Sequence, residues 1–402
     1  MGSGKDTASS EFITRLPDLQ ALAGRLRRHP AFAVDTEFER ERTYWPKLQL
    51  VQVAAPGLAA VVDPLAVESM DPLFDLIAAP AIQKVTHAGR QDAEIFAMRM
   101  GRPPANLYDT QIAAALVGLG GQVGYANLVQ RLLHTKLRKT ERVTDWGRRP
   151  LTPAQLTYAA DDVRYLLPIK DHLDRELDTL GRTDWLAEEL AFYSDPAFYE
   201  RDPDTLWMRV SGWRTLEPRG WALLRELARW REDEAMSRDI PRNRVTGDDV
   251  LVEIALRDPE SVSDLAPLRR LHPRERERSG KAILEAVARG RAVLEKDLPS
   301  VPRAKPEDGE SSLVADLMGV VMKRRASENR IAPSYLGTQK ELSQVVAWLA
   351  GSRNGSPPPL LTGWRKRLVG DELIALFDGR AALHVDEGKR VRVRREERRT
   401  GG

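Results

Sequence analysis

The segment FAVDTEF, residues 32–38, decides the fold of this chain. Asp35 and Glu37 lie two residues apart in an otherwise apolar run, which predicts a β-strand with both carboxylates on one face. Val34 and Phe38 make a solvated edge strand a poor alternative. Two carboxylates that are buried together repel each other unless cations lie between them. The segment therefore predicts a sheet that carries a metal site on one face.

A second segment, YAADDVRYL, places Tyr158 and Asp162 on a helix. Thr152 is a good N-cap and Pro153 is favoured at the first helical position, so the helix is expected to begin there. Tyr158 and Asp162 are then one turn apart on the same face, where both can point at one reacting water. Asp161 is rotated about 100° away from them.

A fourth carboxylate, Asp92, lies in HAGRQD, residues 87–92. With Asp35, Glu37 and Asp162 it completes a set of hard oxygen ligands that suits two divalent ions, Mg²⁺ or Mn²⁺. Two such ions about 4 Å apart activate a water and stabilise the leaving oxygen of a phosphodiester. The chemistry predicted is hydrolytic phosphoryl transfer.

These segments resemble the DEDD superfamily of 3′ to 5′ exonucleases, in the subclass whose third motif is Tyr, three residues, Asp. They are similar to the ribonuclease D family in particular. The first motif, DTEFERERTYWPKLQLVQVA, has the family's Asp-Thr-Glu-Phe opening, and the second, KVTHAGRQDAEIF, has its His-Ala-Gly and its Asp. The first motif also has the family's later positions, at Thr43, Tyr44, Pro46, Leu48, Leu50 and Gln52.

The resemblance implies a role for each matched residue. Asp35, Glu37, Asp92 and Asp162 correspond to the metal-binding carboxylates of the family. Tyr158 corresponds to the residue that helps to orient the attacking water. With Tyr at this position, the metals rather than a side-chain base are expected to do most of the deprotonation.

A basic segment, RLLHTKLRKTERVTDWGRRPLT, precedes the catalytic helix. In the family the matching stretch ends in Asp-Trp and then Arg-Pro-Leu, and it lies near the active site. Asp145 and Trp146, then Arg149 to Leu151, follow that pattern here. We expect Lys139 and Arg149 to hold the substrate backbone.

The order of elements predicts an α/β domain at residues 11–195, after a disordered N-terminus at 1–10. FAVDTEF, LQLVQVA and AAVVD are separated by short gaps, which favour an antiparallel meander. A helix near residues 69–79 then leads to a fourth strand, IQKVTHA, and helical periodicity follows as far as about residue 180. This order fits a ribonuclease H-like exonuclease domain, in which helices flank a mixed sheet.

Two all-α helical bundles are expected after this domain. Residues 203–296 have helical periodicity, and their WRE-x-x-A and Arg-Asp-Ile-Pro-Arg stretches resemble the helicase and RNase D C-terminal (HRDC) domain, which usually helps to bind nucleic acid. A linker at 297–311 leads to a second, divergent HRDC-like domain at 312–380. The basic tail at 381–402 is expected to be mobile.

Composition limits the class of protein. With 402 residues, 42% hydrophobic and 30% charged, the chain is expected to fold into two or three domains. A net charge of only +3 means that nucleic-acid binding would need local basic patches. The absence of cysteine excludes disulfides and thiolate chemistry. No apolar stretch is long enough to span a membrane, so we expect a cytoplasmic protein with no membrane and no obligate protein partner.

Several residues have a structural interpretation beside the functional one. His87 either bonds a phosphate or nucleotide or is a satisfied core histidine, and Asp109 is better explained as an N-cap than as a ligand. Four tryptophans are more compatible with a core than with base stacking, and three arginines either contact phosphates or form a solvated face. These residues are Trp207, Trp213, Trp221 and Trp230, with Arg238, Arg242 and Arg244.

The activity predicted is a metal-dependent 3′ to 5′ exoribonuclease that releases nucleoside 5′-monophosphates. By resemblance, its substrates are tRNA precursors with 3′ extensions. A DNA exonuclease is the alternative, because the carboxylates act on the phosphodiester and do not by themselves read the 2′-OH. A noncatalytic nucleic-acid-binding protein is a third possibility, and the presence of all four carboxylates and Tyr158 counts against it.

Overall fold

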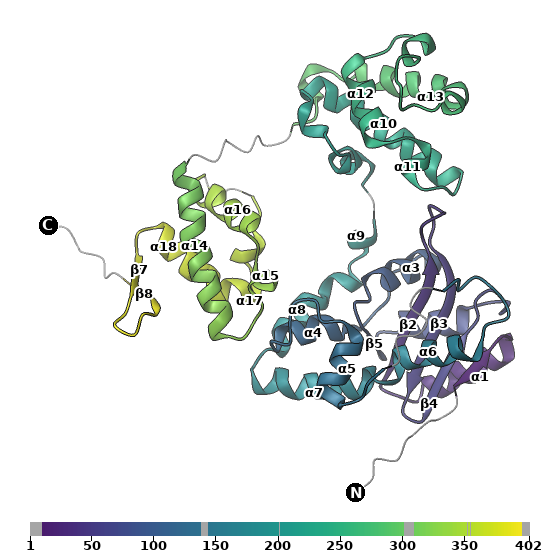
Figure 1. Ribbon diagram of the computed structural model, residues 1–402, viewed down its shortest axis with the longest axis vertical. Coiled ribbons are helices and arrows are strands. Elements are labelled where there is room, and N and C mark those ends of the chain that lie inside the picture. Colours follow the sequence, from purple (N-terminus) through teal and green to yellow (C-terminus); the bar gives the residue numbers. More distant parts are fainter. Residues whose placement is uncertain are drawn as a thin grey trace, which may run out of the picture.

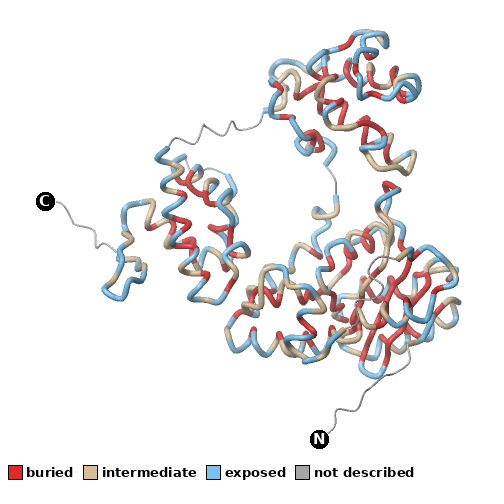
Figure 2. Tube along the Cα trace, in the orientation of Figure 1, coloured by how far each residue is buried: buried red, intermediate tan, exposed pale blue. Residues whose placement is uncertain are grey.

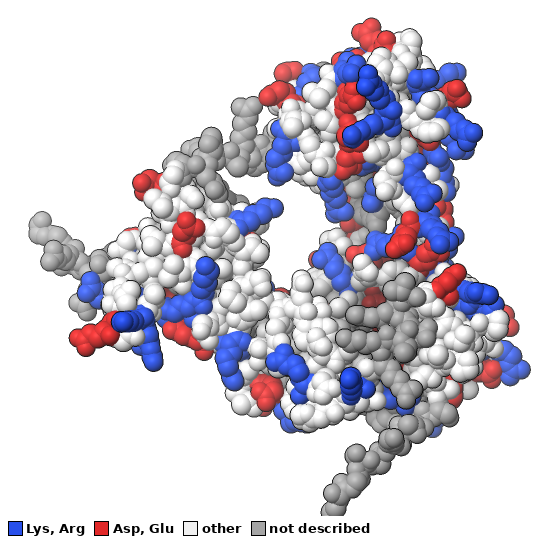
Figure 3. Space-filling view, in the orientation of Figure 1, with Lys and Arg blue, Asp and Glu red and all other residues white. Residues whose placement is uncertain are grey.

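The computed structural model describes residues 10–137, 144–200, 202–300, 309–351, 353 and 355–395. Figure 1 shows three groups of elements around a central opening, which is also visible in the space-filling view of Figure 3. We name them the sheet domain, from β1 to α9, the first helical domain, from η2 to η5, and the second helical domain, from α14 to α18. Each group has its own buried interior (Figure 2).

The sheet has six strands in the order β1-β4-β3-β2-β5-β6. The strands β2, β3 and β4 pair antiparallel, and β5 runs parallel to β2, which confirms the predicted meander within a mixed sheet. The outer strands β1 and β6 were not predicted, because three residues are too few to show an alternating pattern. The strands are β1 Glu11–Ile13, β2 Ala31–Glu39, β3 Lys47–Ala55, β4 Leu58–Val62, β5 Gln83–Thr86 and β6 Leu107–Asp109.

Helices pack against both faces of the sheet. Phe32 and Val34 of β2 point into the core beneath α1 and α2, whereas Ala33 points into the core beneath α4, α5 and α7. Because side chains alternate along a strand, Asp35 and Glu37 lie on the same face as Ala33. The helices are α1 Leu16–Leu26, α2 Asp71–Ala78, α3 Arg90–Met100, α4 Thr110–Leu116, α5 Tyr125–Leu133, α6 Pro153–Arg164, α7 Leu166–Thr179, α8 Thr183–Leu190 and α9 Pro196–Tyr199.

A β-bulge interrupts the pairing of β2 with β3 next to Glu37. Glu37 is opposite Leu50, but the next residue, Phe38, is opposite Leu48. Gln49 is therefore the extra residue on β3. Bulges bend a strand and redirect its side chains, and they are common beside active sites. Here the bend begins immediately after the second of the two carboxylates.

The first helical domain has α10 at its centre. All four of the tryptophans named above are buried in its core, which confirms the structural interpretation for them. No strand occurs among its described residues. Its elements are the 3₁₀ turns η2 Pro203–Arg209 and η3 Trp213–Thr215, the helices α10 Pro218–Ser237, α11 Arg242–Val245 and α12 Asp248–Arg257, η4 Val262–Leu265, α13 Pro273–Arg291 and η5 Glu295–Asp297.

The second helical domain is also all-α, and a β-hairpin follows it where a mobile tail was expected. In AALHV and VRVRR, Val and Leu recur at every second position, and Asp386 to Lys389 form the turn between the two strands. This is a hairpin pattern. The prediction of a mobile tail rested on the charge of the stretch alone. The elements are α14 Gly309–Glu328, α15 Pro333–Leu336, α16 Gln339–Ala350, η6 Pro359–Leu361, α17 Gly363–Arg365, η7 Lys366–Gly370, α18 Asp371–Phe377, β7 Ala381–Val385 and β8 Val391–Arg395.

The predicted domain boundaries remain a proposal, and the elements group in accordance with them. Residues 1–9 of the expected disordered N-terminus, the middle of the expected linker and the last residues of the tail lie outside the described residues. Within the part of the chain that is described, no helix is both long enough and apolar enough to cross a membrane.

Candidate active site

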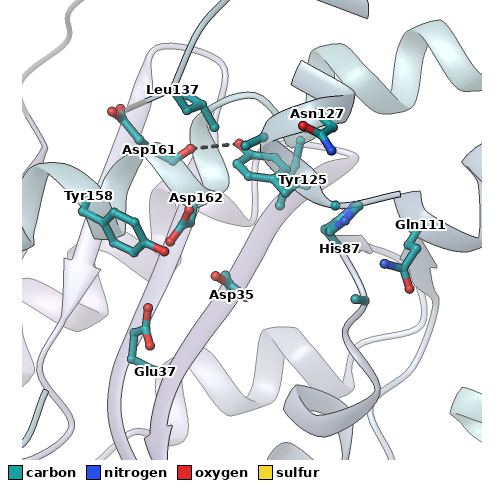
Figure 4. A pocket seen from close by; sticks show the side chains of 14 residues that line it. Asp35, Glu37, His87, Gln111, Tyr125, Asn127, Leu137, Tyr158, Asp161 and Asp162 are labelled. Atoms are coloured by element: carbon teal, nitrogen blue, oxygen red, sulfur yellow. Dashed lines mark hydrogen bonds between the residues drawn. The ribbon is translucent and has the colours of Figure 1, made fainter. Parts of the chain in front are cut away.

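A cavity of about 430 Å³ opens on the carboxylate face of the sheet (Figure 4). Asp35 and Glu37 line it from β2, and Tyr158 and Asp162 line it from α6. The opposite wall comes from the turn after β5 and from α4 and α5. The structure therefore brings four of the five predicted catalytic residues to one cavity, although they are separated by more than 120 positions in the sequence.

Asp35 and Glu37 are half-buried, and their charged neighbours are other carboxylates. Burial is the main cause that raises the pKa of Asp35 well above its usual range, and repulsion from Asp92, Asp162 and Glu37 adds to it. Burial, followed by repulsion from Asp162 and Asp92, raises the pKa of Glu37 to about 8. The face of the sheet thus holds negative charge that a cation would stabilise.

Asp92 approaches the same charges from the first turn of α3. Burial raises its pKa to about 6, although the hydroxyl of Thr36 donates a hydrogen bond to its carboxylate and opposes the rise. Thr36 is the residue between Asp35 and Glu37, so this bond ties α3 to the centre of β2. Asp92 lies beside the other three carboxylates without lining the cavity itself.

Asp109 fixes the turn that leads into α3. Its carboxylate accepts hydrogen bonds from the backbone N–H of Gln111 at 2.8 Å, which confirms the predicted N-cap, and from those of Ala88 and Gly89 at 3.0 Å each. A Cβ atom on Gly89 would lie only 2.3 Å from the side chain of Thr86, so the turn requires glycine there. Asp109 is thus a structural residue that helps to place Asp92.

The helix α6 begins as predicted. Thr152 and Gln155 form a capping box, and Pro153 occupies the first turn. Tyr158 and Asp162 point toward the cavity in Figure 4, whereas the Asp161 carboxylate points elsewhere. That carboxylate accepts a hydrogen bond from Arg164 at 3.1 Å.

The four carboxylates, Asp35, Glu37, Asp92 and Asp162, form what we call the carboxylate cluster. Its donors are hard carboxylate oxygens. Burial raises the pKa values of three members, and repulsion within the cluster adds to the rise for Asp35 and Glu37, so the donor set fits divalent cations. Among the described residues, no three acidic or histidine side chains converge at ligand distance as they lie.

His87 lies at the cavity wall with both ring nitrogens occupied. Its Nε2 donates to the Val123 carbonyl at 3.0 Å, and its Nδ1 lies 2.9 Å from the hydroxyl of Thr110. Burial lowers the pKa of His87. These contacts favour the satisfied-histidine interpretation over a direct phosphate ligand.

Arg149 makes its hydrogen bonds within the protein. Its guanidinium donates to the Asp63 carboxylate at 2.6 and 2.8 Å, and to the carbonyls of Gln49 at 3.0 Å and Trp146 at 2.6 Å. These contacts attach the segment before α6 to the β3 bulge. They favour a structural role for Arg149, and its predicted contact with substrate stays a prediction. Lys139, the other predicted substrate contact, lies outside the described residues.

The arginines singled out in the first helical domain have different environments. Arg238 and Arg242 donate to Glu275 and Glu232, while Arg244 is exposed. Lys and Arg side chains are nevertheless numerous over this domain and its border with the sheet domain in Figure 3, with Asp and Glu interspersed.

The wall of the cavity opposite the carboxylate cluster was not predicted from the sequence. This wall includes Gln111, Tyr125, Asn127 and Leu137. They are uncharged and lie on three different segments, so no local pattern connects them. The Gly-rich run before Tyr125 is a turn signal and does not by itself indicate a binding site.

Known families and structures match this chain along most of its length. A 3′-5′ exonuclease family matches residues 10–178, and the HRDC domain family matches residues 221–287. Ribonuclease D of Granulibacter bethesdensis is 40% identical over 389 residues, covering 96% of each chain. Ribonuclease D of Gluconacetobacter diazotrophicus is 42% identical over 383 residues, covering 94% of this chain and 95% of that protein.

The crystal structure of Escherichia coli RNase D, described as an exoribonuclease involved in structured RNA processing, is similar to the whole fold. It aligns with a TM-score of 0.83 and 31% identity, and covers 92% of this chain and 99% of that one.

A mixed sheet with clustered carboxylates, a Tyr-x-x-x-Asp helix and a following HRDC domain define a 3′ to 5′ exonuclease of the DEDD class. Within this class, the chain belongs to the ribonuclease D family. It is a 3′ to 5′ exoribonuclease, as predicted, and its family acts with divalent metal ions. The HRDC match covers the first helical domain alone, so an HRDC origin of the second is not confirmed.

Proposed function

We propose that the carboxylate cluster holds two divalent cations, Mg²⁺ or Mn²⁺, and that Tyr158 orients the attacking water. The observation that carries this proposal is that Asp35 and Glu37, half-buried at the cavity wall, have other carboxylates as their charged neighbours. When bound, such ions activate a water and stabilise the leaving oxygen. Tyr158 and Asp162 share the cavity face of α6, so the phenol can hydrogen-bond to a water beside that carboxylate.

We also propose that the cavity receives the 3′-terminal nucleotide. Its volume of about 430 Å³ lies in the range of pockets for small ligands, and the carboxylate cluster occupies one end of it. A 3′ end that enters the cavity brings its last phosphodiester to the carboxylates and leaves the rest of the strand outside. This arrangement explains release of one nucleoside 5′-monophosphate at a time.

Among RNAs, precursors of tRNA with 3′ extensions are the substrates that we propose, because the chain resembles the ribonuclease D family over nearly its full length. Single-stranded DNA is the alternative, since the carboxylate cluster acts on a phosphodiester that both polymers share. Selection of RNA would depend on the wall that faces the sugar, where Gln111 and Asn127 supply polar side chains.

The test is the release of mononucleotides from matched 3′-extended RNA and DNA strands with Mg²⁺, Mn²⁺ or EDTA. We expect metal-dependent shortening of the RNA, faster than that of the DNA, with no products in EDTA. A preference for DNA would favour the alternative substrate. Binding of RNA without shortening in any metal would contradict the catalytic assignment.

A further inference from the structure

The loop between α4 and α5, residues 117–124, separates the cavity from the second helical domain. We call it the pocket loop. Four of its eight residues are glycine, and two of these, Gly118 and Gly120, have positive φ angles of 87° and 120°. A loop of this composition has many conformations available to it, so neighbours must hold it in a single one.

On its outer side, the pocket loop packs against the second helical domain. A Cβ atom on Gly118 would lie 2.1 Å from the carbonyl oxygen of Arg330, which means that the two backbones are in direct contact. A Cβ atom on Gly121 would lie 3.6 Å from the Cβ atoms of Ala332 and Tyr335. The segment that enters and forms α15 therefore covers the loop.

On its inner side, the pocket loop holds two residues of the cavity wall. The Val123 carbonyl accepts hydrogen bonds from Nε2 of His87 at 3.0 Å and from Nε2 of Gln111 at 3.1 Å. Both side chains line the cavity opposite the carboxylate cluster (Figure 4). One carbonyl of the pocket loop thus accepts hydrogen bonds from both of these side chains.

The loop also reaches the catalytic helix through Tyr125, which follows Gly124 directly. Its hydroxyl donates to the Asp161 carbonyl at 2.8 Å, drawn as the dashed line in Figure 4, and accepts from the backbone N–H of Tyr165 at 3.3 Å. These bonds fix the end of α6 beside Asp162.

Arg182 connects the second helical domain to the start of the pocket loop. Its guanidinium donates to the carbonyl of Leu116, the residue before the loop, at 2.6 Å. It also donates to the carbonyl of Asn329, the residue before Arg330, at 2.8 Å. The side chain is buried, with 4% of the residue exposed. Nearby, Trp185 and Trp364 stack with their ring centres 4.7 Å apart.

We propose that the second helical domain positions the wall of the 3′-nucleotide cavity by holding the pocket loop. Docking of this domain then sets the affinity for the terminal nucleotide, even when the substrate is too short to reach the domain. Preorganisation supplies the physical reason, because a wall that is already ordered loses less entropy when ligand binds. The inference rests on the proposed function, in that the cavity must receive the 3′-terminal nucleotide.

The experiment uses the full chain and a 5′-phosphorylated diribonucleotide, with kcat and KM measured separately. Arg182→Met removes both bridging hydrogen bonds, and Gly121→Leu drives a bulky side chain between the loop and α15. The matched control is Arg324→Met, which removes ion pairs with Glu328 and Glu372 within the second helical domain without touching the loop. Thermal melts verify that each variant is folded at the assay temperature.

We expect Arg182→Met and Gly121→Leu to raise KM for the dinucleotide at least fivefold with kcat within twofold of the wild type. Arg324→Met should leave both constants within twofold. Binding of adenosine 5′-monophosphate with Mg²⁺, followed by calorimetry, should weaken by the same factor in the two loop variants.

An unchanged KM in folded loop variants would overturn the inference, as would an equal rise in the control. A loss confined to long RNA would also overturn it, because the domain would then act only as an RNA-binding surface. If the wild type neither cleaves the dinucleotide nor binds the monophosphate, the proposed function itself has failed, and the two failures are thereby distinguished.

Discussion

The carboxylate cluster of the sheet domain and the buried acidic side chains of the first helical domain have opposite charged neighbours. In the first helical domain, Glu226, Glu232 and Glu275 are buried, and each carboxylate has an arginine within reach. The pairs are Glu226 with Arg289, Glu232 with Arg242 and Glu275 with Arg238. In the carboxylate cluster, Asp35 and Glu37 are half-buried at the cavity wall, and their charged neighbours are carboxylates.

This difference separates acidic residues that hold a fold together from acidic residues that are available for chemistry. A buried carboxylate beside an arginine is compensated, and removing either partner destabilises the domain. Carboxylates that face one another store unfavourable energy, which a bound cation can release. Burial, followed by repulsion from Asp162 and Asp92, raises the pKa of Glu37 to about 8, which is the direction expected for a carboxylate with no cation beside it.

We expect Asp35→Asn to cause the largest loss of activity. The change removes a charge from the centre of the carboxylate cluster, so we expect kcat to fall by about 10³-fold, or roughly 4 kcal/mol. The same change removes repulsion, so urea unfolding at pH 8 should show a variant at least as stable as the wild type. Turnover that persists, or a large loss of stability, would contradict the assignment of Asp35.

Next in size is the contrast between neighbours on α6. Asp162→Asn should lower kcat by about 10²-fold, because Asp162 lines the cavity with Tyr158. Asp161→Asn should change kcat by less than about threefold, because its carboxylate binds Arg164 and only its main chain contacts Tyr125. Single-turnover rates on one RNA measure both. Equal losses would show that the helix register is wrong.

The converse experiment is Glu232→Gln in the first helical domain. Its pairing with Arg242 is lost, and we expect the free energy of unfolding of this domain to fall by ~2 kcal/mol. Turnover of a dinucleotide should remain within about twofold of the wild type, since Tyr44 still finds an acceptor in the amide oxygen. A Glu232→Gln variant that keeps the wild-type stability but no longer cleaves the dinucleotide would contradict the assignment of Glu232 to the fold alone.

The smallest expected effect is a pH-dependent stabilisation by Mg²⁺. The pKa of Glu37 is raised to about 8 from 4.5. Ionisation of this carboxyl group therefore destabilises the folded protein by an amount that is absent below about pH 4.5 and grows as pH rises toward 8. Protons compete with metal over the same range. We expect saturating Mg²⁺ to raise Tm by roughly 5 °C at pH 8 and by less than half of that at pH 6. A shift that is larger at pH 6 would contradict this linkage.

Sequence patterns were sufficient wherever the determining contacts are local. The alternation around Asp35, the capping residues of α6 and the N-cap at Asp109 each depend on neighbours within a few positions, and all three expectations about structure were confirmed. The outer strands β1 and β6 depend on pairing with β4 and β5, and three residues leave no readable period. The β7–β8 hairpin was not predicted because the many charged residues of this stretch favoured a mobile tail.

Contacts between distant positions were not predictable from such patterns. The guanidinium of Arg149 binds Asp63, which lies 86 residues away, and no local pattern predicts this contact, whereas the predicted contact of Arg149 with substrate stays a prediction. Arg182 reaches Asn329 across 147 residues. The wall of the cavity depends on such contacts, whereas the carboxylate cluster could be assembled from three short motifs.

The most direct test of the central claim is a calorimetric titration with Mn²⁺ at pH 7.5, in two buffers of different ionisation enthalpy. The wild type should bind two ions and release protons, because Glu37 with its pKa of about 8 must ionise to bind metal. Asp35→Asn should lose at least one ion, and Glu232→Gln should keep both. Absence of binding in the wild type, or equal loss in Glu232→Gln, would contradict the claim that the carboxylate cluster is the metal site.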